Sequence, residues 1–399
     1  MKISTRSRYG LRLMIQLAGS NGKRLVPLRE IAETQQISGK YLSRLVIQLR
    51  RNRLIRAGRG TNGGYTLTSK HVLIAFLILG GLTATSYGSS RLFYLEAQAV
   101  ASYANSAGEN EIFWYSMMPG DPMQKPSIGF DLLQRFSGEG GDWGILAIQA
   151  RVSYDTSRRY DLEPQLYNAY FKLKTGPGDF WLGHNKPSFG FSSYLDNHGT
   201  LLQPLSMYGF GYDRDWGAGY YRDFESGNLA LSATTGSGMP LYLRGNYMLS
   251  GRVSKGDLNQ QNYNLGLSAS SGKNLEAMGY HLMPMDPTPT AMIGTDAILL
   301  SNRWENRLEF IWSRKTWNYP QNQYVSDYVI FHRLTANLLD ENRLKLEVQN
   351  RWMLGEWGNG MLTLAGSYQI TADLALRSMV EIDDENTRVI AQLYWYHKI

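Results

Sequence analysis

The side chains best suited to catalysis lie in one irregular stretch, residues 184–212. There, His184 and His198 are near Ser188 and Asp196 in the chain, and these residue types can act as base, nucleophile and orienting acid. Proximity within a loop does not define a triad, however, and the six histidines show no metal-ligand spacing. No HExxH, GxSxG, phosphate-loop or dinucleotide-binding glycine motif occurs. We therefore expect no enzyme, no metal site and no cofactor.

Cysteine is absent from the 399 residues. Its absence excludes disulfides, thiolate zinc sites, a cysteine nucleophile and cysteine-ligated iron–sulfur clusters. The mean hydropathy of −0.34 also excludes a helical membrane protein, because such chains are far more apolar.

A second set of side chains offers electrostatics rather than covalent chemistry. These charged residues alternate with apolar ones along several segments. A row of such charges would line an aqueous lumen and set the field for passing ions. Alternatively, some of its members pair with each other across strands. The set consists of Arg151, Arg244, Arg252, Lys345, Glu347, Arg351, Arg377 and Glu381.

From about residue 90 onward, the apolar residues recur with a period of two. Leu146, Ile148 and Val152 fall on one face of an expected strand, and Gln149 and Arg151 fall on the other. The same alternation runs through residues 343–354, 362–370, 374–382 and 389–395. Tight polar turns join several segments: LDEN from Leu339, WGNG from Trp357 and DDEN from Asp383.

Two sheet architectures fit this alternation. A soluble sandwich would bury the apolar face, whereas a membrane barrel turns that face toward lipid and encloses the charged face in a wet lumen. Segments of about ten residues match tilted membrane strands, and Trp143, Trp312 and Trp352 lie near segment ends, where interfacial girdles form. We expect a mostly β fold, an antiparallel transmembrane β-barrel of about 16 strands over residues 90–399. The stretch 184–212 would fold inward and narrow the lumen, or form an extracellular loop.

Residues 68–89 have the composition of a secretory signal. Lys70 precedes the apolar run VLIAFLILGGL from Val72 to Leu82, and small residues follow it, with a cleavage site expected within residues 84–90. The run is too short to cross a bilayer of roughly 30 Å as a helix. The alternative is a buried strand or core helix. The anomaly is its position, because a signal belongs at the start of a chain.

The first 70 residues differ from the rest in charge and in pattern. They hold 15 Lys and Arg against 2 Glu, a balance of +13, whereas the remaining 26 basic and 32 acidic residues give −6. Apolar residues recur at helical spacing from Thr5 to Arg53, and Pro27 suits the first turn of a new helix. Short β-like pieces then flank the turn GRGTNGG. This order is the outline of a winged helix-turn-helix.

The motifs of residues 1–67 are more specific. MKISTRSRYGLRLM, LREIAETQQISGKYLSRLVIQLRRNRLI and RAGRGTNGGY resemble the winged-helix transcriptional regulators of the IscR/NsrR type. The resemblance implies that duplex DNA is a partner. It also implies a recognition helix carrying Ser38, Lys40, Tyr41 and Arg44, and a wing formed by Arg59, Gly63 and Gly64. That family continues into a dimerisation helix and often a cysteine-ligated cluster, whereas here the resemblance ends near Leu67. We expect no sensor cluster and only weak DNA binding.

The larger part resembles bacterial outer-membrane porins in architecture and in the segment FWLGHNKPSFG from Phe180. The resemblance implies passive diffusion of small solutes or ions, contact with outer-membrane lipid and a homo-oligomer. The predicted domains are thus 1–67, 68–89 and 90–399. We expect a chimera in which a porin-like barrel follows a truncated regulator, through a fusion of reading frames or an overextended gene start. The alternative is a membrane-anchored regulator, with residues 1–67 in the cytoplasm and a periplasmic β-sheet sensor.

Overall fold

A computed structural model of the chain describes most of the larger part and scattered segments of the smaller one. The chain divides into two compact units, residues 1–87 and 88–399, which are described separately. The described residues are 13, 16–17, 25–35, 42–43, 46–47, 49–50, 55–58, 63–67, 90–106, 109–113, 124–154, 162–196, 198–278, 281–282, 286–317, 323–355, 358–384 and 386–399.

The smaller unit contains helix α2 (Leu28–Gln35) and the antiparallel pair β1 (Ile55–Gly58) and β2 (Gly64–Leu67). Helix α2 begins directly after Pro27, as the sequence predicts. Gly64 is needed at the start of β2, because a Cβ there would lie 2.6 Å from the backbone of Val26. Ile31 of α2 and Ile55 of β1 share one core with buried apolar side chains from other described positions, namely Leu13, Leu17, Val26, Leu42 and Val46, and Tyr65 of β2 packs against it. The helix and the glycine-turned hairpin are therefore confirmed.

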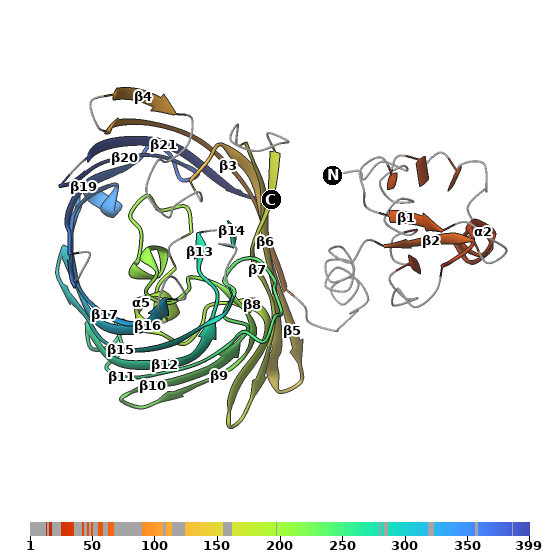
Figure 1. The fold of residues 1–399 in the computed structure, drawn as a ribbon, viewed down its shortest axis with the longest axis horizontal. Helices are drawn as coiled ribbons and strands as arrows, with labels where there is room; N and C mark the ends of the chain where they lie inside the picture. The colour runs from red at the N-terminus through yellow and green to blue at the C-terminus, as the bar shows by residue number, and fades with distance from the viewer. Residues whose placement is uncertain are drawn as a thin grey trace. The chain divides into compact units, whose positions relative to one another are not determined.

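The larger unit is a closed antiparallel barrel of 16 strands (Figure 1). Each strand pairs with its neighbours in sequence, and β21 closes the ring by pairing with β3 from Asn386↔Ser106 to Lys398↔Tyr94. The wall strands are β3 (Ser90–Ser106), β5 (Ser127–Gly138), β6 (Gly141–Tyr154), β7 (Leu162–Thr175), β8 (Gly178–Asn185), β9 (Asp215–Phe224), β10 (Gly227–Thr234), β11 (Tyr247–Lys255), β12 (Tyr263–Asn274), β15 (Thr288–Ser301), β16 (Trp304–Trp317), β17 (Gln323–Leu338), β18 (Leu344–Leu354), β19 (Gly360–Gln369), β20 (Leu374–Asp383) and β21 (Asn386–Lys398).

Short elements complete the barrel. Strand β4 (Glu109–Phe113) pairs with the second half of β3, beyond the part that pairs with β5. A two-stranded sheet, β13 (Ala277–Met278) with β14 (His281–Leu282), lies between β12 and β15 in the chain. The predicted turn LDEN joins β17 to β18 through the 3-10 turn η2 (Asp340–Asn342). Within the described segments, no helix has the length and apolar character needed to cross a lipid bilayer.

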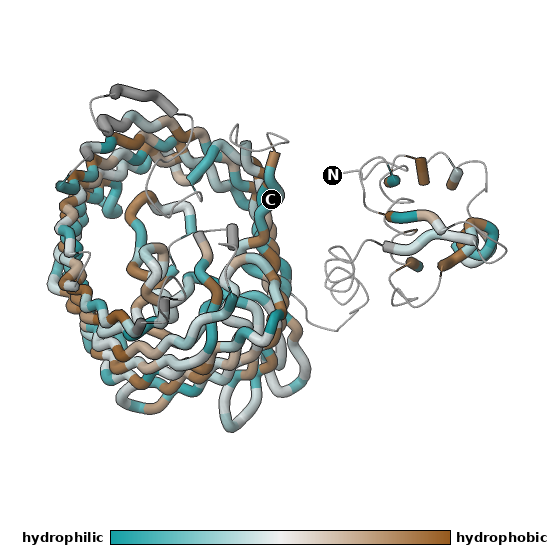
Figure 2. Tube along the Cα trace, in the orientation of Figure 1, coloured by the Kyte–Doolittle hydropathy of each residue, from teal (hydrophilic) through white to brown (hydrophobic). Residues whose placement is uncertain are grey.

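The barrel wall is inverted relative to a soluble sheet. On β19, Leu362 and Leu364 are 37% and 45% exposed, whereas Thr363 between them is 0% exposed. Other outward leucines are similarly exposed, and charged side chains such as Arg252 and Glu381 are buried. Figure 2 shows the alternation of polar and apolar residues along the strands. Leucines exposed to water in such numbers are unfavourable, so this outer surface has the character expected of a membrane barrel, and the predicted barrel fold is confirmed.

We predict that Leu364→Arg lowers the free energy of unfolding by about 2–4 kcal/mol, because it places a charge near the middle of the lipid-facing surface. Urea titration of the chain refolded into phospholipid vesicles measures this change. Leu243→Arg is the matched control, since Leu243 is 72% exposed in the connection between β10 and β11. Equal destabilisation by the two variants would contradict a lipid-facing wall.

Candidate functional site

The connection between β8 and β9, residues 186–214, folds into the barrel, and we call it the inner loop. It contains helix α5 (Gly190–Tyr194) and the 3-10 turn η1 (Leu205–Tyr208), and α5 lies inside the ring of strands (Figure 1). Two backbone amides of α5 are held by the wall. Gly190 N–H donates to Ser268 Oγ at 3.0 Å, and Phe191 N–H donates to Glu309 Oε1 at 2.9 Å. The expectation that this stretch narrows the lumen is confirmed.

The middle of the inner loop is held by cationic side chains from other strands. Arg377 on β20 donates to the Gly199 carbonyl, and Arg333 on β17 donates to the Gln203 carbonyl at 3.4 Å. Lys315 on β16 donates to the Gly209 carbonyl at 2.7 Å. The guanidinium of Arg351 lies 4.0 Å from the centre of the Tyr208 ring. Basic side chains of the barrel wall therefore hold the loop in place by donating to three of its carbonyls and by contacting the ring of one of its tyrosines.

Apolar contacts hold the inner loop as well. Phe189, Phe191 and Phe210 pack against inward residues of β15, β16 and β17, among them Ile311 and Phe331. On the opposite wall, a second cluster joins Leu201 and Leu202 of the loop to three buried wall residues, Val100, Met379 and Ile390. The loop thus crosses the lumen and is anchored on both sides.

Ion pairs cluster where the loop begins and ends. Arg214 contacts Asp196 at 3.1 Å and Asp213 at 3.2 Å, and Lys186 Nζ lies 3.6 Å from Asp196 Oδ1. Burial and the positive charge of Arg214 lower the pKa of Lys186 to about 8, although Asp196 opposes this shift. Burial alone would raise the pKa of Asp196, but Lys186 and Arg214 outweigh it and hold that pKa well below its ordinary value.

Two cavities in the described part of the barrel border the inner loop. One extends from the loop to β16–β20 and encloses about 900 Å³ that is open to solvent; we call it the arginine cavity. The other, which encloses about 1060 Å³, lies against β7–β11 and is lined by Tyr170, Trp181, Tyr194, Tyr220 and Tyr221; we call it the aromatic cavity. Asp196 lines both.

The arginine cavity is the more strongly cationic. Five basic side chains and two acidic ones line it. In the aromatic cavity each basic side chain has a carboxylate nearby: Arg252 with Asp296 at 2.5 Å, Lys172 with Asp179 at 3.9 Å, and Lys186 and Arg214 with Asp196. A small anion in the lumen would therefore meet a favourable field mainly on the β16–β20 side.

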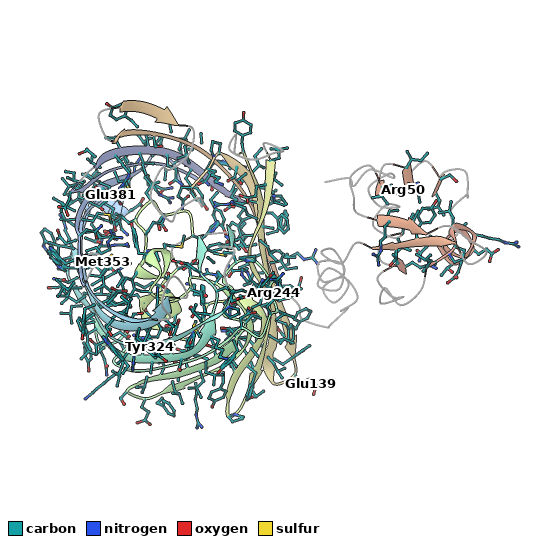
Figure 3. The ribbon with its side chains drawn as sticks, viewed as in Figure 1. Arg50, Glu139, Arg244, Tyr324, Met353 and Glu381 are labelled. Atoms are coloured by element: carbon teal, nitrogen blue, oxygen red, sulfur yellow. The ribbon has the colours of Figure 1, made fainter. Side chains whose placement is uncertain are left out.

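The structure places seven of the eight predicted pore residues on wall strands. Arg151 hydrogen-bonds Gln165 at 2.7 Å, and Glu381 (labelled in Figure 3) pairs with Arg388 at 2.5 Å. Lys345, Glu347 and Arg377 line the arginine cavity, and Arg252 lines the aromatic cavity. Arg351 contacts the inner loop, as described above. Some of these residues therefore pair across strands and others line cavities inside the barrel; that they line a conducting pore stays a prediction.

Arg244 differs from the expectation that it belongs to the polar face of a strand. It lies in the connection between β10 and β11, where its backbone N–H donates to the Asn246 side chain and its guanidinium lies 5.0 Å from the Tyr242 ring. The connection spans residues 235–246 because Asp215 accepts hydrogen bonds from the backbone amides of Gly236 and Gly238, which ends the β10 ladder.

Most of the residues that we predict to bind DNA lie outside the described residues. This is so for Ser38, Lys40, Tyr41, Arg44 and Arg59, and for the signal-like segment 68–89. Gly63 and Gly64 are described, and Gly64 begins β2.

The loop residues considered for catalysis are engaged elsewhere. His198 Nε2 lies 2.6 Å from Glu96 of β3, and its ring contacts that of Tyr167 with centroids 4.3 Å apart. Ser188 N–H donates to Ser232, and His184 belongs to β8, where its ring stacks on Trp216. Where the structure describes these side chains, it brings no serine and histidine of this set together.

Sequence reasoning missed the residues that hold the loop. Three basic residues that contact the loop or its ends are not singled out from the sequence alone. Arg333 lies in a strand, Lys186 lies within the irregular stretch 184–212, and Arg214 lies just after it. The alternation on β17 is blurred because Val329 and Phe331 face inward against the loop. A pattern of charged residues at every second position therefore does not reveal Arg333.

Comparison with known proteins separates the two parts of the chain. Residues 3–78 match the family profile described as Rrf2, an iron-dependent transcriptional regulator. This amino-terminal segment is an Rrf2-type regulator segment. It is 47% identical over 70 residues to the transcriptional regulator CymR of Bacillus subtilis, and the matched stretch covers 18% of this chain and 51% of CymR. It is 42% identical over 67 residues to the regulator IscR of Sodalis glossinidius, covering 17% and 41%. The chain spans about half the length of the curated relatives it matches.

The larger unit has the fold of outer-membrane porins. It resembles an anion-selective porin from Comamonas acidovorans with a TM-score of 0.56 and 10% identity, over 78% of this chain and 100% of that one. The channel DcaP of Acinetobacter baumannii gives 0.53 and 11% over 78% and 98%, and OmpT of Vibrio cholerae gives 0.53 and 10% over 78% and 99%. At these identities the likeness establishes the fold alone.

We predict that the Lys186 amine titrates near pH 8. Asp196→Asn lowers this pKa further by removing a stabilising carboxylate, whereas Arg214→Gln raises it by removing a nearby positive charge. The pH dependence of amine acylation, read on the Lys186 peptide by mass spectrometry, measures all three. An ordinary pKa of Lys186 in the wild-type chain would contradict the described ion-pair cluster. So would changes of the same sign in this pKa in the two variants.

Proposed function

We propose that residues 90–399 form an outer-membrane pore for passive diffusion of small solutes, with a preference for anions. The observation that carries the proposal is the combination of a lipid-facing outer wall with a charged lumen. The proposal also places this part of the chain in the outer membrane, in contact with lipid and with further copies of itself. The regulator segment is a separate functional element in the same chain.

Three features support an anion preference. The arginine cavity has more basic than acidic side chains. Solvent-accessible space lies between the inner loop and β16–β20, beside these charges, and charges of one sign beside such space favour ions of the opposite sign. One structural neighbour is described as an anion-selective porin. The buried ion pairs of the aromatic cavity do not add to this preference, because their charges are largely neutralised.

We predict that the refolded chain gives discrete conductance steps in planar bilayers and that the reversal potential under a KCl gradient favours chloride. Lys345→Glu with Arg351→Glu shifts that potential toward potassium, because it reverses two positive charges on the inward face of β18. Reversal-potential measurements on both forms test the two statements.

The matched control is Arg222→Glu with Arg314→Glu. The guanidiniums of these residues lie against the rings of Phe224 and Tyr324, and neither residue lines either cavity. Material that stays soluble in water without detergent and never conducts would overturn the pore. An unchanged reversal potential in the β18 variant would remove Lys345 and Arg351 from the pathway.

A second candidate function, weak DNA binding by residues 1–67, is supported by the Rrf2 match and the charge of +13 over residues 1–70. In the alternative arrangement, this segment remains in the cytoplasm as part of a membrane-anchored regulator with the barrel-forming part as sensor. The barrel has no free sheet edge between β3 and β21 and exposes leucines outward, which favours the pore over a periplasmic sensor sheet.

We predict that residues 1–87 bind duplex DNA weakly, with an affinity that falls steeply with salt. Each phosphate contact adds about 0.9 to the negative slope of log affinity against log salt. Fluorescence anisotropy at several salt concentrations gives the slope, and Lys40→Gln with Arg44→Gln reduces it by about 2. Affinity that does not change with salt would contradict phosphate contacts.

A further inference from the structure

The basic side chains of the arginine cavity differ in what they are paired with. Lys345 Nζ lies 3.8 Å from Glu347, and Arg307 Nε lies 2.5 Å from Glu305. Arg333 and Arg377, in contrast, hydrogen-bond only neutral oxygen atoms in the described part of the chain. Arg333 donates to the side-chain oxygen of Gln349 at 2.8 and 2.6 Å and to the Gln203 carbonyl. Arg343 also donates only to neutral oxygens, the carbonyls of Gln369 and Ile370, but its side chain is exposed. Among the less exposed guanidiniums of this cavity, those of Arg333 and Arg377 therefore have no carboxylate in ion-pair contact.

Both guanidiniums hold the same stretch of the inner loop. Arg377 also donates to the side-chain oxygen of Gln392, at 3.1 Å, and lies 4.6 Å from the Tyr394 ring centre, so it is held in place from the β21 side. Its bond to the Gly199 carbonyl and the bond from Arg333 to the Gln203 carbonyl engage loop residues only four positions apart. Both side chains line the cavity together with the neutral residues Thr200 and Ser367. The two carboxylates of the lining have other basic partners: Asp196 pairs with Lys186 and Arg214, and Glu347 lies beside Lys345.

We propose that the arginine cavity is a binding site for one small oxyanion with two negative charges, held between Arg333 and Arg377. This inference rests on the proposed pore and deepens it. Guanidinium groups are always charged and present planar sets of N–H donors that match tetrahedral oxyanions. A divalent ion compensates both charges at once, whereas a monovalent ion compensates one and leaves the other unpaired. The site makes passage of such ions saturable rather than proportional to concentration.

Sulfate and methanesulfonate are the probes, because both present sulfur-bound oxygens but sulfate carries two charges and methanesulfonate one. Calorimetric titration of the full chain refolded in detergent micelles measures binding directly. We expect saturable sulfate binding at one site and methanesulfonate binding that is weaker by about tenfold or more. In bilayers, sulfate added to KCl reduces the chloride current with the same concentration dependence.

Substitutions assign the site. Arg333→Gln and Arg377→Gln each weaken sulfate binding about tenfold and remove most of the preference over methanesulfonate. Arg222→Gln is the matched control, since Arg222 lies against Phe224 and outside both cavities, and it leaves sulfate binding unchanged. Equal binding of the two probes by the unaltered chain overturns the proposal, and this comparison decides even if an arginine variant fails to refold.

The two readouts separate this proposal from the pore itself. Sulfate binding that depends on Arg333 and Arg377, without any conductance, would overturn passive diffusion and leave the anion site standing. Conductance steps without saturable sulfate binding would overturn the anion site and leave the proposed pore standing. Binding that Arg222→Gln weakens as much as Arg377→Gln would reflect general surface charge and would also overturn the site.

Discussion

The constraint on which this structure depends is that no backbone polar group can remain unpaired in hydrocarbon. Water is absent there, so each unpaired N–H or C=O costs several kcal/mol. A sheet can satisfy this requirement only by closing on itself, because an open sheet always has two edges. In this chain, closure joins the first wall strand to the last: β3 pairs with β21 over the register from Asn386↔Ser106 to Lys398↔Tyr94. Every other wall strand pairs with its sequence neighbours.

Closure also decides where the charges go. With an apolar outer wall, most of the side chains that alternate inward are polar. Several of them pair with one another, as in the pair of Arg252 with Asp296 and the pair of Arg388 with Glu381. The inner loop provides the remaining partners, since its carbonyls accept from Arg377, Arg333 and Lys315. The loop is thus part of the wall's hydrogen-bonding scheme as well as an obstruction in the lumen.

The strand pattern could be predicted from the sequence because the two faces of a wall strand contact different solvents. Residues 343–354 and 374–382 show it clearly, and they match β18 and β20 closely. The lumen could not be predicted in the same way. Where the loop packs against the wall, apolar residues such as Ile311 and Phe331 face inward, and the period of two disappears. Which carbonyl meets which arginine depends on contacts such as Arg377 with Gly199, 178 positions apart, and local spacing contains no information about them.

The two units impose different demands on one chain. The proposed DNA binding needs duplex DNA, whereas the proposed pore needs lipid over outward residues such as Leu346 and Leu376. The pore's demand is the stronger of the two, because leucines and valines exposed to water in such numbers favour aggregation. The basic side chains of the regulator segment, in contrast, are compatible with water whether or not DNA is bound. Under the proposed function, the barrel therefore sets the environment of the full chain, and DNA binding by the segment depends on whether DNA reaches it there.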